Sequence, residues 1–326
     1  MNRTASLDHI DRRKIVYFVS DNGFIVIFVL WCLFLTVQTQ GRFLSPDNVA
    51  TVLRQAAIIG IVAIGESLVV LLGGMDVSVA STLGFCAIVF AAAVVTFGLH
   101  PLIAVLAALG VGALIGAVNG LLVTAVGINP IIATLGMMTI LDGLGLAYTG
   151  GRTIYGDAMD PVEFLYGGWV GPVPVPVIIL FVCYAIAHFA LNYTTFGAHI
   201  YATGSNDKAA WLSGVKTARI RLVAFVVAGA MAAFGALVAA ARRGSAGAGM
   251  GGDFLFPILT AVILGGISLA GGRGHVLKVL VAAIFLMAIN NGLILLGGVD
   301  ISAQRIVSGA ILIVALSLDR LRTWVG

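Results

Sequence analysis

The chain has 326 residues, of which 60% are hydrophobic and only 10% are charged. Soluble domains are nearer half apolar and a quarter charged, so this composition excludes a soluble globular protein and makes the lipid bilayer the main solvent. The formal net charge of +4 is not gathered into a basic stripe, which excludes a nucleic-acid-binding surface. The basic residues lie instead at the ends of apolar runs.

Taken in chain order, the apolar runs predict an all-α membrane protein with about ten spans, because a bilayer core needs about 20 apolar residues per helix. The spans are expected at 22–39, 49–72, 77–98, 101–125, 128–147, 174–191, 219–241, 256–271, 276–296 and 303–318. The eighth is short and glycine-rich, so we expect it to be broken. No run between the spans could form a soluble domain, and residues 1–326 are therefore expected to form a single membrane domain. The first run lacks a following small-residue cleavage site, which indicates a retained helix.

Basic residues predict the orientation of these spans, since cytoplasmic loops are enriched in Lys and Arg. Three clusters lie in the N-terminal segment 1–21, in the loop 192–218 and at the C-terminus. Even numbers of spans separate them, so all three, both termini included, are expected in the cytoplasm. Arg242 and Arg243 break this rule because they fall on the outer side.

Glycines mark two kinds of feature. Gly110, Gly112, Gly116 and Gly120 recur within the fourth span, where small residues let helices approach closely. The segments 71–78 and 263–270 also resemble one another, each with a Gly-Gly pair after an apolar run. Such repeated interruptions can mark broken helices beside a transport pathway.

The loop 192–218 contains a short helix signal. Ser205 or Asn206 can cap the helix, Asp207 suits the positive end of its dipole, and Gly214 can end it. The predicted helix, 207–213, is too short to be stable alone in water. Its apolar residues would gain from docking, either into another protein or onto the membrane domain itself.

This loop resembles the cytoplasmic loop of the ribose/xylose/galactose-type permeases of ABC importers, whose pattern is T-x-x-G followed by A-x-G-x-N-x-x-A-A-x-x-S-G. The matching residues are Thr194, Gly197, Ala202, Gly204, Asn206, Ala209, Ala210, Ser213 and Gly214. The resemblance implies that the short helix is a coupling helix, which sits in a groove of a separate ATPase subunit. The ATPase-coupling residues it implies are Gly197, Gly204, Asn206, Asp207, Ala209, Ala210, Ser213 and Gly214.

Three further stretches, 73–80, 119–152 and 264–293, resemble the same family in the same order. They match its G-G-I-D-L-S-V-G, its N-G with P-x-F-I-A-T-L-G-x-M, and its L-G-G-x-S-L-x-G-G-x-G with N-N-G. Met75, Val77, Ala80 and Asn129 are mild departures. Glu66 is a larger departure, because we expect Met, Gln or Thr there.

The resemblance also implies a fold, an assembly and a solute. The fold is the vitamin B12-type (type II) importer permease fold in the bacterial inner membrane. The partners are two copies of an ABC ATPase, a second permease protomer in a homodimer, and a periplasmic sugar-binding protein. The solute is a pentose, a hexose or a related polyol. An ABC permease for a nucleoside or a branched-chain amino acid is the nearest alternative.

Polar residues inside or beside the spans are candidates for the translocation pathway, because buried carboxylates and amides are costly in lipid and can bind sugar hydroxyls. The candidates are Glu66, Asp76, Asn119, Asn290 and Asn291. The alternative is that they make interhelical polar contacts.

No catalytic motif accompanies them. The sequence lacks the G-x-x-x-x-G-K-[ST] phosphate loop and the H-E-x-x-H zinc motif, so we expect a transport subunit without enzyme activity, metal or cofactor. Two alternatives remain: an ion-coupled secondary transporter in which Glu66 and Asp142 carry protons, and a membrane scaffold.

Overall fold

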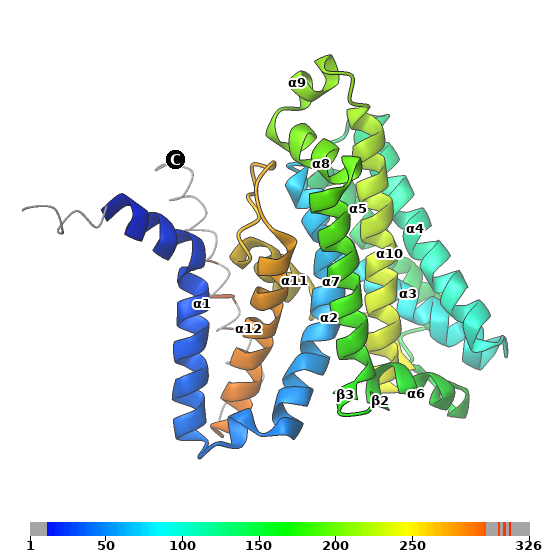
Figure 1. The fold of residues 1–326 in the computed structure, drawn as a ribbon. Coiled ribbons are helices and arrows are strands. Elements are labelled where there is room, and N and C mark those ends of the chain that lie inside the picture. The colour runs from blue at the N-terminus through cyan, green and yellow to red at the C-terminus, as the bar shows by residue number, and fades with distance from the viewer. Residues whose placement is uncertain (1–11, 298–305, 307–308, 311–312, 314–326) are drawn as a thin grey trace, which may run out of the picture.

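A computed structural model describes residues 12–297, 306, 309–310 and 313 of the chain (Figure 1). Long helices dominate it: α1 (Arg12–Gln38), α2 (Pro46–Leu71), α3 (Val79–Ala91), α4 (Pro101–Thr124), α5 (Pro130–Thr149), α6 (Asp160–Gly167), α7 (Val175–Tyr193), α8 (Thr195–Ser205), α9 (Asp207–Leu212), α10 (Thr217–Arg243), α11 (Leu255–Leu264) and α12 (Val276–Leu295). A π-helical turn, Ala92–Thr96, extends α3, and short 3-10 helices lie at Arg42–Leu44 and Asp157–Met159.

Two small antiparallel sheets complete the described part. β1 (Ile154–Tyr155) pairs with β4 (Ser245–Ala246), and β2 (Trp169–Val170) pairs with β3 (Val173–Pro174). They lie beyond the ends of long helices, and Ala246 of β4 and Ile154 of β1 contribute to the edge of the core.

Seven described helical segments are long and apolar enough to cross a membrane, so the chain is a multi-pass membrane protein. They correspond to the expected spans two to seven and nine. The expected first and eighth spans correspond to shorter apolar helices, Ile25–Gln38 and Leu255–Leu264. α11 ends before Gly265 and Gly266, and Gly266 takes a left-handed conformation with φ 81°, which ends the helix as expected for a broken span. The expected tenth span, 303–318, lies outside the described residues apart from four isolated positions.

The core of the bundle is built around α2, α3 and α10, which the remaining helices cover. The apolar window of α2 is 83% buried, whereas those of α4 and α5 are each 28% buried. α4 approaches α10 so closely that a Cβ built on Gly116 would lie 2.1 Å from the Phe225 carbonyl oxygen, and one built on Gly229 would lie 2.0 Å from that of Gly112. The expected close packing through glycine is thus confirmed at Gly112 and Gly116, whereas Gly110 faces open space.

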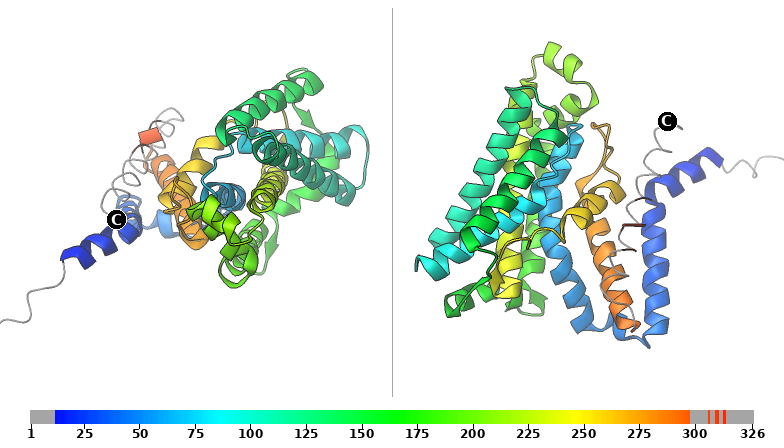
Figure 2. Two further views of the ribbon diagram at one scale, coloured as in Figure 1. Left: turned by 90° about the horizontal axis from the view of Figure 1, so that it is seen from above. Right: turned by 180° about the vertical axis from the view of Figure 1, so that it is seen from behind.

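The bundle has two distinct ends. α8 and α9 lie at one end, and α6 with the β2–β3 hairpin lies at the other (Figure 1). We call these the α9 end and the α6 end. α1 and α12 stand to one side of the bundle in all views (Figures 1 and 2), where the Phe28 and Phe285 rings pack 5.2 Å apart.

Two arginines at the α6 end have aromatic partners. The guanidinium of Arg54 lies 4.6 Å from the centroid of the Trp169 ring and also donates to the Gly167 carbonyl oxygen. The guanidinium of Arg242 lies 5.7 Å from the centroid of the Tyr166 ring. A cation over the face of an aromatic ring is stabilised by its attraction to the ring. This contact gives a physical reason for Arg242 to lie at the α6 end, although the charge rule favours basic residues on the cytoplasmic side.

Candidate functional site

The short helix α9 forms where the sequence predicts it. The side chain of Asn206 accepts a hydrogen bond of 2.9 Å from the Ala209 backbone N–H, which identifies Asn206, and not Ser205, as the cap. The helix covers Asp207–Leu212, one residue fewer than expected. Gly214 follows with φ 87°, a left-handed conformation that a side chain would strain.

α9 presents an apolar surface to solvent. Trp211 is 64% exposed and Leu212 is 70% exposed, whereas Ala210 is buried against the rest of the chain. Two large apolar side chains on one exposed turn are unusual outside a binding surface. Of the two readings that the sequence leaves open, docking of these side chains onto the membrane domain is not found among the described residues.

A closely packed backbone junction anchors the loop that carries α9. The Gly272 N–H donates to the Leu71 carbonyl oxygen at 2.8 Å, and Gly204 lies against both. A Cβ on Gly204 would stand 1.9 Å from the Leu71 oxygen. The Tyr201 hydroxyl also donates to the Gly274 carbonyl oxygen at 3.0 Å. The end of α8 is therefore joined to the end of α2 and to the loop 265–275.

The two Gly-Gly segments noticed in the sequence both lead into this junction. Gly73, with φ 74°, ends α2, and a Cβ on Gly271 would lie 2.8 Å from the Gly73 nitrogen. The sequence analysis missed the contact between Gly204 and the Gly271–Gly272 pair. Only the doubled glycine at 271–272 could have indicated this contact. Doubled glycines outside helices often mark positions where backbone segments approach closely.

Arg221, at the start of α10, adds a second link. Its guanidinium forms an ion pair of 3.2 Å with Asp207 and donates to the Leu72 carbonyl oxygen at 3.3 Å. An ion pair this exposed contributes little stability. Its value is positional, because it connects the first turn of α9 to the end of α2. No motif in the sequence indicates this role for Arg221.

A buried polar network lies next to this junction. Asn119 on α4 donates to the Ser78 hydroxyl at 2.9 Å, and Ser78 donates to the Asp76 carboxylate through both its hydroxyl and its backbone N–H. The Asp76 N–H in turn donates to the Glu66 carboxylate at 3.1 Å. Burial raises the pKa of the Asp76 carboxyl, and the hydrogen bonds from Ser78 act in the opposite direction.

Thus three of the five pathway candidates, Glu66, Asp76 and Asn119, come together at the α9 end. All three are buried in this conformation. One oxygen of Glu66 and the amide oxygen of Asn119 have no hydrogen-bond donor within the described part of the chain.

The other two candidates lie at the far end of α12. Asn291 and Asn48 exchange a reciprocal pair of amide hydrogen bonds, of 2.9 and 3.0 Å, which ties α12 to the start of α2. Asn290 is half-buried beside this pair. The sequence analysis missed Asn48, which carries no motif of its own.

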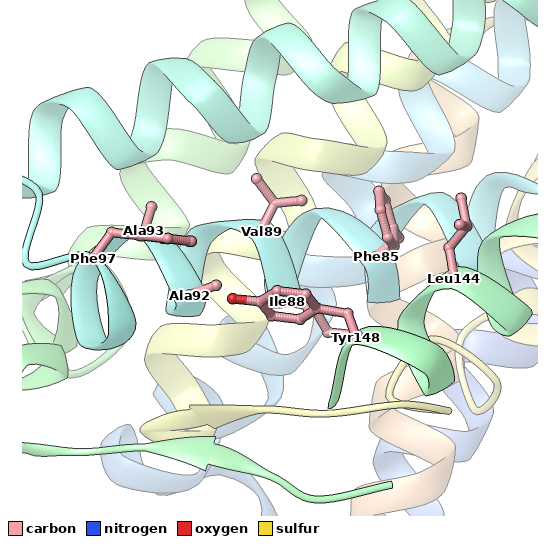
Figure 3. Close-up of a pocket in the computed structure, with 8 residues that line it drawn as sticks. All are labelled: Phe85, Ile88, Val89, Ala92, Ala93, Phe97, Leu144 and Tyr148. Carbon is pink, nitrogen blue, oxygen red and sulfur yellow. The ribbon is translucent and has the colours of Figure 1, made fainter. Parts of the chain in front are cut away.

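Two recesses open on the bundle surface. One, of about 370 Å³, lies between α3 and α5, and Figure 3 shows the Tyr148 ring and Leu144 of α5 facing Ile88, Val89 and Ala92. Its lining carries one polar side-chain group, the Tyr148 hydroxyl, so it is poorly suited to a sugar. The other, of about 360 Å³, lies at the α9 end and is lined by Val123, Thr124, Gly127, Ile128, Asn129, Pro130, Asp207, Thr217, Ala218 and Arg221. Within residues 12–297 and the four isolated positions, no group of His, Cys, Asp and Glu is arranged to hold a metal.

Seven spans, buried polar residues between them and a short capped helix outside the bundle define a multi-pass membrane protein. Comparison of the sequence with known families makes this specific. The chain belongs to the family described as branched-chain amino acid transport system / permease component, whose profile matches residues 48–316.

Individual relatives cover most of the chain. The chain is 36% identical to the ribose import permease protein RbsC of Bacillus subtilis (strain 168), over 85% of this chain and 86% of that protein. It is 32% identical to the D-allose transport system permease protein AlsC of Escherichia coli (strain K12), over 91% and 90%. It is 31% identical to the fructose import permease protein FrcC of Rhizobium meliloti, over 91% and 84%. No solved structure gives a significant match.

Proposed function

We propose that this chain is the membrane-spanning permease subunit of an ABC importer for a monosaccharide, in the bacterial inner membrane. The names of its relatives specify import of ribose, transport of D-allose and import of fructose. The observation that carries the proposal is α9, a capped helix with exposed Trp211 and Leu212, held rigidly against the ends of the spanning helices.

α9 is the coupling helix in this proposal, and a separate ATPase subunit is its partner. A surface that receives force must be anchored to the part that moves. Gly204 and Arg221 connect α9 to the end of α2, so displacement of α9 pulls on residues 71–73. Gly197, Ala209, Ala210, Ser213 and Gly214 shape the same loop. The α9 end is then cytoplasmic, and both chain termini are proposed to lie on that side.

The assembly contains two permease copies, two ATPase subunits and a periplasmic sugar-binding protein, in the vitamin B12-type arrangement of about ten spans per copy. A pathway runs past Asn290 and Asn291 at the outer end and past Glu66, Asp76 and Asn119 at the inner end. Since the inner three are buried in one network, the sugar reaches them only when the loop 72–78 moves. That loop follows the segment of α2 to which α9 is tied.

The first experiment removes the apolar surface of α9 without disturbing its cap. In cells, the double variant Trp211→Ala with Leu212→Ser should lose co-purification with the ATPase subunit and at least 90% of sugar uptake, because truncating one central aromatic anchor such as Trp211 costs about 2 kcal/mol or more. The matched control is Leu106→Ala, a 61% exposed side chain on α4. It should retain both properties.

If the double variant keeps both its ATPase partner and its uptake, the coupling assignment is wrong. If uptake in the unmodified chain survives deletion of the ATPase and collapses with the proton gradient, the protein is an ion-coupled transporter instead.

A further inference from the structure

The exposed face of α5 differs in character from the exposed faces of the helices around it. On α4 the exposed residues are all apolar or glycine: Leu102, Ile103, Leu106, Gly110, Leu114, Val118 and Leu121. Such a face matches lipid. On α5 the exposed residues include Gly136, Thr139, Asp142 and Gly143, which lie on one side of the helix together with the apolar Ile132, Leu135 and Leu146. A charged and a hydroxyl side chain among them set this face apart from that of α4.

Asp142 lies deep within this span. It stands seven residues before the end of α5 at Thr149, which places it about 10 Å inside the helix. Across the seven described spans, it is the one exposed charged side chain more than a turn from either end. The aspartate side chain is too short to reach the interface as a lysine or arginine does.

A lipid-facing position for Asp142 is therefore unfavourable. A carboxylate at mid-membrane costs about 2.5–3.5 kcal/mol on insertion scales, and the structure records no hydrogen bond or ion pair for Asp142 among the described residues. Residues of this kind face a bundle interior or a water-filled cavity.

A dry contact with another copy of the chain is also unfavourable unless that copy supplies a cation or hydrogen-bond donors to the carboxylate. The described spans expose no Lys or Arg at this depth. Arg54, at a similar depth in α2, is already held by the Trp169 ring and the Gly167 carbonyl oxygen. Water, or a polar solute in water, supplies hydrogen-bond donors to the carboxylate without such a partner.

We propose that the α5 face of Gly136, Thr139, Asp142 and Gly143 lines the aqueous translocation pathway, and that the Asp142 carboxylate accepts hydrogen bonds from the hydroxyl groups of the transported sugar. This inference rests on the proposed function. A carboxylate offers two oxygens to adjacent hydroxyl donors. Because a Cβ on Gly136 or Gly143 would meet nothing within 4 Å, the backbone beside Asp142 leaves room for a solute.

Access to water is tested by chemical labelling. Cys32, Cys86 and Cys183 are first replaced by alanine, and retention of uptake is checked. Thr139→Cys, Asp142→Cys and the control Leu106→Cys are then treated, in membranes holding the whole transporter, with a charged methanethiosulfonate reagent. Positions 139 and 142 should react and position 106 should not, because the thiolate forms in water and not in lipid.

Two labelling results overturn the inference. In one, the Asp142→Cys variant is as unreactive as the Leu106→Cys control. In the other, the Asp142→Cys variant resists the reagent but forms a disulfide with a second copy of the chain, which indicates a protein–protein contact.

Sugar recognition is tested in the chain that keeps Cys32, Cys86 and Cys183. Asp142→Asn and Asp142→Leu should each raise the half-saturating concentration for uptake, with ribose, allose and fructose assayed separately, by about 10-fold or more for the sugar that is carried. Co-purification with the ATPase should not change, which separates this inference from the proposed function. The matched control is Asp47→Asn, in the first turn of α2. An unchanged half-saturating concentration in both Asp142 variants contradicts a role in sugar recognition, even if labelling shows that position 142 is accessible to water.

Discussion

At the scale of single residues, Gly204 stands where three backbone segments meet. The end of α8, the carbonyl of Leu71 and the N–H of Gly272 approach so closely that no side chain fits between them. The motif around Gly204 predicted a functional loop but gave no hint of these neighbours, which lie far away along the chain. The requirement for glycine at this position is therefore steric.

A substitution at this position should test how rigid the junction must be. Gly204→Ala places a methyl group 1.9 Å from the Leu71 oxygen, so the backbone must shift, at a cost of about 1–3 kcal/mol. We expect a lower thermal unfolding midpoint in detergent and impaired uptake. Gly110→Ala on α4, where a Cβ would meet nothing within 4 Å, should leave both unchanged. Equal thermal unfolding midpoints for the two variants contradict a close backbone contact at Gly204.

At the scale of elements, seven of the ten predicted spans are found as described helices long and apolar enough to cross a membrane, because lipid imposes a length and an apolar composition on every crossing helix. α9 was predictable for a related reason, since its cap and its terminal glycine are local signals. For α11, the glycine-rich run predicts a broken span but not the residue at which the helix ends. Its apolar run continues past Gly265, yet a left-handed Gly266 and packing against Val279 end the helix after Leu264.

Contacts between elements could not be predicted in the same way. Asn119, Asp76 and Glu66 were singled out as polar residues in apolar surroundings, but their assembly through Ser78 depends on how α2, α3 and α4 pack. The exposed side of α5 was equally invisible, because a single sequence does not say which face of an apolar helix meets its neighbours.

The pair Asn48–Asn291 is a test of one such contact. Asn48→Ala leaves the buried Asn291 amide without its partner, and Asn291→Ala removes one of the partners of the half-buried Asn48 amide, whereas the double variant removes both side chains. The double variant should therefore lose less stability than the sum of the two single variants, with a coupling of about 0.6–1.7 kcal/mol, as found for hydrogen bonds between membrane helices. Thermal unfolding in detergent measures it, and strict additivity is the contrary result.

At the scale of the whole molecule, the two ends of the bundle must lie on opposite sides of the membrane. α9 and the hairpin β2–β3 mark these ends (Figure 1). The charge rule predicts a cytoplasmic α9 loop, and this orientation stays a prediction. Of the two arginines that break the rule, Arg242 has a local aromatic partner in Tyr166.

Sidedness can be measured with one cysteine at each end in a chain otherwise free of cysteine. Trp211→Cys and Val170→Cys occupy positions that are 64% and 57% exposed. With the chain produced alone, an impermeant maleimide should label position 170 from outside intact spheroplasts and position 211 only in inside-out vesicles. The reverse pattern contradicts the proposed orientation.

The contact of Gly204 with Leu71 and Gly272 has a practical consequence for building hybrid transporters. Exchanging the whole loop 192–218 for that of a relative would pack the α8 of another protein against the Leu71 and Gly272 backbone of this chain. Exchanging only 206–214 replaces the exposed turn and leaves the contacts of Gly204 with Leu71 and Gly272 intact. The boundary of the graft, more than the identity of the donor, should decide whether a hybrid folds.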